Sequence, residues 1–511
     1  LLPMMFVAAF FFHKNISKLQ KMVAAIFALF LVLSLWLKPL ENIWNGLRTV
    51  ESYYFRYSYV MIACFIFLAA FGINQSKEIE KKSLDISAGI FECIILFFGL
   101  RHQVYYKYII FSFLMVIVYV LLIHLHWRGW KRILIVCITV ELIINGYILL
   151  NRVIEKNDAK DYVTYVEKEQ KLLAELKSYD QGTYRIDQTS KRWNAADVNE
   201  SMSYGFHGIA NYSSTYDTNL ALKLAQLGYS KNRTVYSLYK EPNLALDSLF
   251  GLKYLISSED YGQFQEVTQL KAYLGKRIYY NKDALPMGYA VSDKAIGGID
   301  SQKNVFEITN QMYSNILGKK VEIFSPVRVT VQDTGSTEQT YFLPKQTQEN
   351  CYIYGYSMFT SENIGCNIDH GRKIDPNYSL WMSEPVFNIG NGNQSHIVTF
   401  TNDIQDDSAQ SVIFYALNKK LLDEVTAQIK GNAVDRIAID KNKIKISYTA
   451  KEETNLLLSI PYNTNWDIRI NGKKVSYEKA LDMFISMKTE KGSNQIEMTY
   501  HTPGVLMGIG V

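Results

Sequence analysis

Carboxylates and guanidinium groups gather in the predicted loop at 39–56, where Glu41, Arg48 and Arg56 lie among aromatic residues. A group transfer that releases a phosphate needs a carboxylate base near the attacking hydroxyl group and cations that hold the departing phosphate. Arginine suits the second role because its planar donors bind phosphate bidentately. A plainer interpretation stays open, since loop charges beside Trp and Tyr also make the ordinary interfacial belt of a membrane protein.

Arg101 opens the next loop of the same kind and is followed by His102. Its guanidinium could contact the same phosphate, or it could anchor a helix at the membrane edge. We therefore take Arg56, Arg48 and Arg101 as candidate phosphate contacts, and Glu41 as a candidate contact to the acceptor or the sugar.

A second group of polar and aromatic residues lies between 199 and 217. It includes Tyr204, His207, Tyr212 and Asp217. Aromatic rings with polar neighbours suit the stacking and hydroxyl recognition that sugars require, which makes these four residues candidate acceptor or sugar contacts. The alternative is a packed loop core.

Cys351 and Cys366 bound a hairpin-sized segment. They could form a disulfide in an oxidising compartment, or they could be two separate buried thiols. The chain has no C-x-x-C motif, no His at ligand spacing, no Gly-rich phosphate loop and no nucleophile elbow. No cofactor is evident, a divalent metal stays open, and the catalytic residue stays unknown.

The elements that must position these residues fall into two halves. The chain has 511 residues with a net charge of +5, too small for an inference of nucleic-acid binding. Up to about residue 151 it is dominated by apolar residues, and a spanning helix needs about 20 of them. We predict spans, the first and last of them partial, at 1–12, 22–38, 57–73, 84–100, 108–126, 133–151 and from 503 onward.

Lysine and arginine indicate how these spans are oriented. The loops at 13–21, 74–83 and 127–132 carry three basic residues each, and they alternate with the less basic loops at 39–56 and 101–107. The positive-inside rule places the first set in the cytoplasm. Residues 152–502 are then expected outside a cytoplasmic membrane that the chain crosses several times.

The second half reads as soluble protein. Helical periodicity predicts helices at about 152–180, 217–228, 303–316 and 421–429. Short apolar or alternating runs predict strands near 251–256, 277–280, 287–291, 321–324, 327–331, 351–354, 396–400, 411–415, 443–448 and 466–470. Asn471-Gly472 is the strongest hairpin signal.

The fold class expected is a polytopic α-helical membrane domain followed by a large extracytoplasmic region, first mixed α/β and then β-sandwich or jelly roll. The boundaries predicted from these patterns are 1–151 for the helical membrane domain, 152–320 for the α/β domain, 321–432 for a β-rich domain, 433–502 for a final β domain and 503–511 for the start of a last span.

Segments spread over most of the chain resemble the YfhO family of bacterial membrane proteins. They are IWNGL at 43–47 with FRYSY at 55–59, NESMSYG at 199–205 with YSS at 212–214, LDSLFGLKY at 246–254 with ALPMG at 284–288, and the C-terminal series Pro461, Trp466, Asn471-Gly472, Gly492 and Pro503-Gly504. Their order and spacing carry the resemblance.

The resemblance implies a GT-C-like glycosyltransferase that takes a sugar from a polyprenyl-phosphate donor and passes it to a cell-surface polymer such as lipoteichoic acid. Its partners would be membrane lipid, the lipid-linked sugar and the polymer, with no nucleic acid. It also implies that the catalytic carboxylate lies in a first outer loop upstream of this sequence.

Two other functions stay open. One is a non-enzymatic, membrane-anchored module that binds polysaccharide or a partner enzyme. A transporter is a third interpretation, and Glu92 and Glu141 are the main charges inside the predicted spans.

Overall fold

The computed structural model describes residues 6–7, 10–47, 55–74, 81–101, 106–125, 129–154, 159–192, 199–213, 216–230, 236–333, 338–358, 365–374, 385–401 and 412–504. The chain divides into two compact units, Leu1–Asp158 and Ala159–Val511. Each unit is described by itself.

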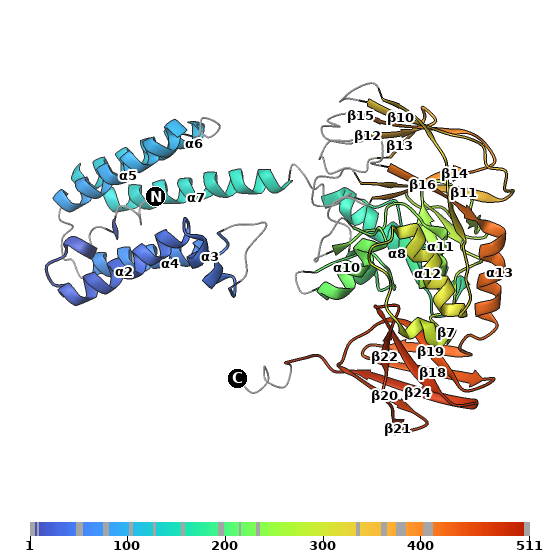
Figure 1. The fold of residues 1–511 in the computed structure, drawn as a ribbon. Coiled ribbons are helices and arrows are strands. Elements are labelled where there is room, and N and C mark those ends of the chain that lie inside the picture. The colour runs from blue at the N-terminus through green and yellow to red at the C-terminus, as the bar shows by residue number, and fades with distance from the viewer. Residues whose placement is uncertain are drawn as a thin grey trace. The chain divides into compact units, whose positions relative to one another are not determined.

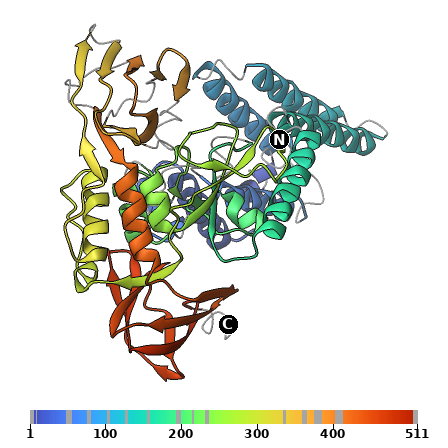
Figure 2. The ribbon, with the colours of Figure 1, turned by 90° about the vertical axis from the view of Figure 1, so that its right-hand side faces the viewer.

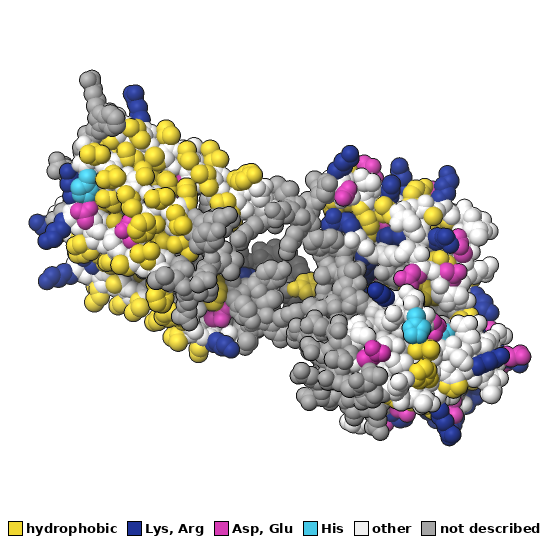
Figure 3. All heavy atoms as spheres, turned by 90° about the horizontal axis from the view of Figure 1, so that it is seen from above, with side chains coloured by type: hydrophobic (Ala, Val, Ile, Leu, Met, Phe, Trp, Pro, Cys, Tyr) yellow, Lys and Arg dark blue, Asp and Glu magenta, His cyan; other side chains and the backbone are white. Residues whose placement is uncertain are grey.

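The first unit is helical. Its helices are α2 (Lys18–Ser34), α3 (Lys38–Trp44), α4 (Ser58–Asn74), α5 (Lys81–Arg101), α6 (Tyr106–Leu125) and α7 (Trp130–Ile154). Buried apolar residues of α4, α5 and α6, among them Ala69, Leu84 and Tyr119, form its small core. Many large apolar side chains are exposed instead, such as Leu142 and Ile143 on α7, and hydrophobic side chains crowd the described surface of this unit (Figure 3).

The span predicted at 22–38 is not one straight helix. α2 ends at Ser34, and α3 leaves it at an angle of 101°. Pro39 is the second residue of α3 and Leu37 before the helix is extended, because proline suits the first turn of a helix, where its missing N–H group would have no intrahelical acceptor. The bend is held by the Trp44 indole, whose Nε1 donates to Ser34 Oγ at 3.1 Å and whose ring stacks on Tyr57 at 5.2 Å.

Among the described residues, one helical stretch, Trp130–Asn151, is long and apolar enough to cross a membrane, and the bent pair α2–α3 makes a second if it counts as one span. Ser58–Gly72 and Ile109–Leu125 are apolar but shorter. The multi-pass arrangement therefore stays a prediction. The predicted partial spans at 1–12 and from 503 onward lie largely outside the described residues.

The second unit begins with an α/β layer (Figure 1). Its sheet has the order β1-β4-β6-β5, formed by β1 (Arg185–Gln188), β4 (Leu252–Ser257), β5 (Gln265–Glu266) and β6 (Arg277–Tyr280), with β1 and β4 parallel. Tyr254 and Ile256 pack with α8 (Ala159–Tyr179), while Leu252 and Leu255 enter the main core.

The main core is covered by short helices. These are α9 (Glu200–Tyr204), α10 (Thr218–Gln226), α11 (Leu244–Phe250), the 3-10 helix η3 (Asp293–Ile296), α12 (Val305–Leu317) and α13 (Lys419–Lys430), with the small hairpin of β2 (Asn211–Tyr212) and β3 (Tyr236–Ser237). α12 and α13 lie side by side in Figure 2. Both helices bury apolar residues in the core, for example Met312 and Leu422.

Two sheets follow that share one core. The first has the order β14-β11-β16-β8, from β8 (Phe324–Pro326), β11 (Cys351–Ser357), β14 (Val386–Asn391) and β16 (Val412–Asn418). The second has the order β13-β12-β15-β10-β9, from β9 (Thr330–Asp333), β10 (Glu338–Leu343), β12 (Gly365–Ile368), β13 (Arg372–Ile374) and β15 (His396–Thr401). Tyr341, Ile353 and Phe387 lie in their common core.

The last two sheets also share a core. One has the order β17-β18-β24-β20-β21, from β17 (Arg436–Asp440), β18 (Lys443–Ala450), β20 (Trp466–Ile470), β21 (Lys473–Lys474) and β24 (Gly492–Tyr500). The other has the order β22-β23-β19-β7, from β7 (Gly288–Val291), β19 (Thr454–Pro461), β22 (Glu478–Ala480) and β23 (Phe484–Thr489). β7 therefore completes a sheet of strands that follow it by more than 150 residues.

The helices expected at 217–228, 303–316 and 421–429 appear as α10, α12 and α13, and the one expected at 152–180 starts later, as α8. The Asn471-Gly472 hairpin is confirmed between β20 and β21, with positive φ at both residues. The strand expected at 321–324 is wrong except at its last residue, because β8 begins at Phe324. Sheet pairing explains the shift, since β8 forms only where it meets Tyr415–Leu417 of β16.

Candidate functional site

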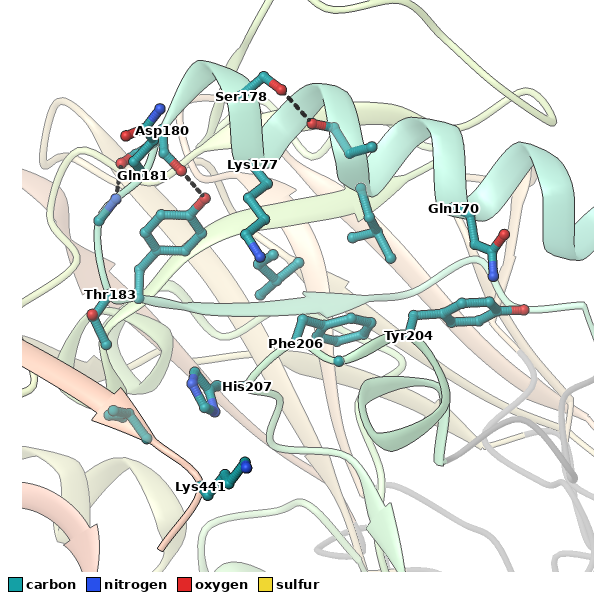
Figure 4. Close-up of a pocket in the computed structure, with 17 residues that line it drawn as sticks. Gln170, Lys177, Ser178, Asp180, Gln181, Thr183, Tyr204, Phe206, His207 and Lys441 are labelled. Atoms are coloured by element: carbon teal, nitrogen blue, oxygen red, sulfur yellow. Dashed lines mark hydrogen bonds between the residues drawn. The ribbon is translucent and has the colours of Figure 1, made fainter. Parts of the chain in front are cut away.

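A groove of about 1080 Å³ lies in the second unit. Its walls come from α8, from β1 with the turn before it, from the segment after α9, and from the tip of the β17–β18 hairpin (Figure 4). The groups that could contact a ligand are three aromatic rings, two lysines, one histidine and several amides and hydroxyl groups. They belong to Tyr184, Tyr204, Phe206, Lys177, Lys441, His207, Gln170, Gln181, Ser178 and Thr183.

α8 forms one wall because it is amphipathic. Leu172 and Leu176 are buried against the sheet, whereas Gln170 and Lys177 are exposed on the side of the groove. Lys177 stands in the last turn, where a cation also interacts favourably with the helix dipole. Figure 4 shows its side chain reaching from α8 toward the strand that runs below.

The aromatic rings are held from behind. The Tyr184 hydroxyl donates to the Asp180 carbonyl at 2.7 Å, and its ring meets Tyr254 edge-on at 5.0 Å. Tyr204 ends α9, and Gly205 follows it with a φ of 70° that brings Phe206 back to the groove. All three rings are half-buried, so each can offer one face to a ligand without becoming fully solvated.

The lining is cationic. Lys177 and Lys441 are exposed, and neither forms an ion pair within the part of the chain that the structure describes. Asp180 is the carboxylate of the described lining, and its Oδ2 already accepts from Lys253 Nζ and from Tyr254 at 2.9 Å. Burial acts to raise the pKa of Asp180, but the hydrogen bond from Lys253 and other donors outweighs it and the pKa is lowered.

His207 adds a group that can change its charge. Partial desolvation at the groove wall, and next the guanidinium of Arg185, lower the pKa of His207 below its usual value of 6.5, although the residue stays exposed. Its backbone carbonyl accepts from Ile186 of β1 at 2.8 Å. The backbone of His207 is therefore positioned by the edge of the sheet.

Asp187 holds the segment that carries His207. Its Oδ2 accepts from the backbone N–H groups of Ile209 at 2.6 Å and Ala210 at 2.9 Å. Gly208 allows this close approach, since a Cβ there would lie 3.2 Å from the same oxygen and 3.1 Å from Ser201 Cβ. The arrangement can bind a polyanion that also carries sugars, with rings for stacking and two ammonium groups that have no ion pair among the described residues and can meet phosphates.

One known protein family matches this chain over its full length. The model of a family described as "Bacterial membrane protein YfhO" matches residues 1–511. The chain belongs to the YfhO family. A relative named "Uncharacterized protein YfhO" from Bacillus subtilis (strain 168) is 22% identical over 529 residues. The match covers 90% of this chain and 58% of that protein, so the chain spans well under two thirds of the relative's length.

Of the four residues between 199 and 217 proposed as acceptor or sugar contacts, Tyr204 and His207 line the groove. The structure does not bring the other two to it. Tyr212 lies in β2, where Asn199 exchanges hydrogen bonds with its backbone. Asp217 caps α10 through its Oδ1, which accepts from Asn219 at 2.9 Å and Leu220 at 3.1 Å.

The phosphate candidates belong to the helical unit. Glu41 lies in the first turn of α3 and Arg56 directly before Tyr57, while Arg101 is the last residue of α5. Glu41 Oε1 is buried without a hydrogen-bond partner in the described structure. Arg48 lies outside the described residues. Their role in holding a phosphate stays a prediction.

The two cysteines are free thiols in this structure, the second of the two alternatives. Cys351 lies in β11 of one sheet and Cys366 in β12 of the other, both buried in or beside the common core. Cys351 Sγ donates to the Gln348 carbonyl at 3.2 Å. Among the described residues no group of three or more His, Cys, Asp or Glu could hold a metal ion.

Sequence reasoning missed Lys177, Tyr184 and Lys441. Lys177 had a visible signal, since it ends an amphipathic helix on its polar face. Lys441 had none, because a lysine in a hairpin turn between β17 and β18 is ordinary until the fold places it beside residues more than 230 positions earlier.

Proposed function

We propose that the full-length protein is a membrane glycosyltransferase that moves a sugar from a polyprenyl-phosphate donor to a cell-surface polymer such as lipoteichoic acid. In this reaction a base removes the proton of an acceptor hydroxyl group, and the oxygen forms a bond to the anomeric carbon. The bond from that carbon to the phosphate breaks, and the polyprenyl phosphate leaves with the electron pair. The chain crosses the membrane several times in this proposal, with residues 152–502 outside.

The observation that carries the proposal is the groove with three aromatic rings and two lysines that form no ion pair with any residue that the structure describes. A polymer of sugars and phosphates offers hydroxyl-rich faces to the rings and anionic groups to Lys177 and Lys441. Membership of a bacterial membrane protein family supports a site at the cell envelope. The exposed apolar helices of the first unit support membrane insertion.

We assign the donor phosphate to Arg56, Arg48 and Arg101, with Glu41 near the acceptor. Arg56 and Tyr57 stand where the loop enters α4, which is headgroup depth if α4 crosses the membrane. The buried, unpartnered Oε1 of Glu41 favours a hydroxyl donor there, because an unsatisfied buried carboxylate oxygen costs free energy. The catalytic base stays outside this assignment.

The same groove favours a second function, a non-enzymatic module that retains polysaccharide at the surface. The two functions share the ligand and differ in chemistry. Full-length protein in proteoliposomes, given a labelled polyprenyl-phosphate hexose and lipoteichoic acid, separates them. We expect label in the polymer. Polymer binding without any transfer would reject the enzyme and leave the binding module.

Variants connect the groove to either function. Lys441→Ala should raise the KM for the polymer about tenfold, as expected for loss of one charge-assisted contact. The matched control is Lys445→Ala, an exposed lysine on β18 that does not line the groove. Equal KM values for the two variants would show that the polymer does not bind in the groove.

A further inference from the structure

A second hollow of about 410 Å³ opens at the other side of the end of α8. It is lined by Tyr179 from the last residue of α8, by Lys253 and Tyr254 of β4, by Tyr280 of β6, and by the exposed polar stretch from Gln265 to Gln269 with Val267 at its base. Amides, a threonine hydroxyl and tyrosine rings are the groups that recognise sugar hydroxyls and sugar faces.

An aromatic run joins this hollow to the groove. Tyr184 of the groove meets Tyr254 edge-on at 5.0 Å, and Tyr254 lies 5.8 Å from Tyr280 of the hollow. Asp180 lines the groove, and both of the side chains that donate to its Oδ2 line the hollow. One wall therefore separates two neighbouring sites on the same unit.

The two sites differ in charge. The groove has two lysines without an ion pair among the described residues. In the hollow, the ammonium of Lys253 is neutralised by Asp180 and lies over the rings of Tyr184 and Tyr254, at 5.3 Å and 5.7 Å. Glu266 pairs with Arg277 at 3.3 Å. The lining thus offers hydrogen bonds and rings with no unpaired cation.

We propose that the hollow at the end of α8 is a second carbohydrate subsite, which takes an uncharged sugar of the polymer whose phosphates lie in the groove. This inference rests on the proposed function. In this proposal the groove binds the anionic backbone of the polymer, and the hollow binds the sugar attached to it. Tyr179, half-exposed at the rim, supplies the accessible ring.

The test uses the full chain in nanodiscs and two probes. The first probe is a set of uncharged tetrasaccharides, namely maltotetraose, galactotetraose and chitotetraose, measured by saturation-transfer NMR. The second is polyglycerol phosphate without sugar. Tyr179→Ala should weaken binding of the best tetrasaccharide about fivefold or more, as expected for loss of a stacking ring. Gln269→Ala should weaken it too, while Tyr212→Ala, an exposed tyrosine outside both sites, leaves it unchanged.

Lys441→Ala separates the two sites. It should weaken binding of polyglycerol phosphate and leave tetrasaccharide binding unchanged. Tetrasaccharide binding should also stay constant between about 50 and about 500 mM salt, whereas polyglycerol phosphate binding should fall. No tetrasaccharide binding to the wild type, or binding that Tyr179→Ala and Gln269→Ala leave unchanged, would overturn the subsite. A wild-type protein that binds a tetrasaccharide but does not bind polyglycerol phosphate would instead count against the proposed function of the groove.

Discussion

The ammonium of Lys276 lies 2.9 Å from the carboxylate of Glu169, and both side chains are buried. The same ammonium donates to the Tyr165 hydroxyl at 2.8 Å and to Gln188 Oε1 at 2.9 Å. α8 is thereby fixed to the sheet through one polar cluster directly behind the groove.

Lys276→Met should destabilise the second unit by about 3–5 kcal/mol, because it leaves Glu169 buried without a cation. Lys445→Met is the matched control, since its pair with Glu497 is exposed on both sides and such a pair contributes at most about 1 kcal/mol. Urea unfolding of the full chain, followed through hydrogen exchange of the α8 amides, measures the loss of stability in both variants. Similar losses of stability for the two variants would show that the buried Lys276–Glu169 pair contributes no more to stability than an exposed pair.

The stability around α9 should depend on pH through Glu200. Burial raises the pKa of Glu200 to about 7 from a usual value of 4.5, despite the hydrogen bond from Tyr165 at 2.6 Å. Glu169, Lys276 and Lys191 are the other charged groups that act on it. Because the folded pKa is raised, the stabilisation is complete below about pH 4.5 and is lost as pH rises through 7.

The shift corresponds to about 3 kcal/mol between these limits. Hydrogen exchange of the α9 amides, converted to a local free energy of opening, should show this decline from pH 5 to pH 8, after correction for the intrinsic exchange rate. Glu200→Gln should flatten the profile, since the amide does not titrate. A wild-type profile as flat as that of the variant would contradict the buried acid.

Gly355→Ala should be strongly destabilising. An added Cβ would lie 2.1 Å from Cζ of the buried Phe387 ring across the sheet. We expect a loss of about 2 kcal/mol or more, because the ring must move within a packed core. Gly371→Ala, where the nearest atom lies 3.8 Å away, should cost less than about 1 kcal/mol. Thermal unfolding compares them, and partial rescue of Gly355→Ala by Phe387→Leu would confirm the cause.

Arg56 is predicted to hold the donor phosphate in the full-length protein. Arg56→Ala should then reduce turnover about tenfold or more at sub-saturating donor, which is the effect of losing a charge-assisted contact. Arg56→Lys should restore little if the contact is bidentate. Rates are normalised to folded protein. If Arg56→Ala turns over as fast as the wild type, the residue is an interfacial anchor instead.

Topology is tested with an impermeant thiol reagent on intact cells. Glu452→Cys places an exposed thiol in the turn between β18 and β19, and it should label before lysis if this unit lies outside. The unmodified protein is the control, because Cys351 and Cys366 are buried and should label little, and its exposed Cys93 sets the background labelling. Labelling of the variant only after lysis would place residues 152–502 in the cytoplasm.

Much of the local structure was readable in the sequence. The periodicity of α10, α12 and α13 is a property of consecutive residues, and so is the Asn471-Gly472 turn, which needs positive φ at two positions. The same holds for the ordered motifs that indicated the YfhO family. Part of the candidate site could be predicted from the sequence, since Tyr204 and His207 lie in one polar and aromatic segment.

The groove itself was decided by tertiary structure. Lys177 and Lys441 come together only because α8 packs on the first sheet while the β17–β18 hairpin belongs to the last one. Asp217 is a candidate sugar contact by residue type, yet its Oδ1 accepts the hydrogen bonds that cap the start of α10. Residue type and spacing therefore determine helices, turns and family, whereas long-range pairing of sheets decides which polar groups are left unpaired to meet a ligand.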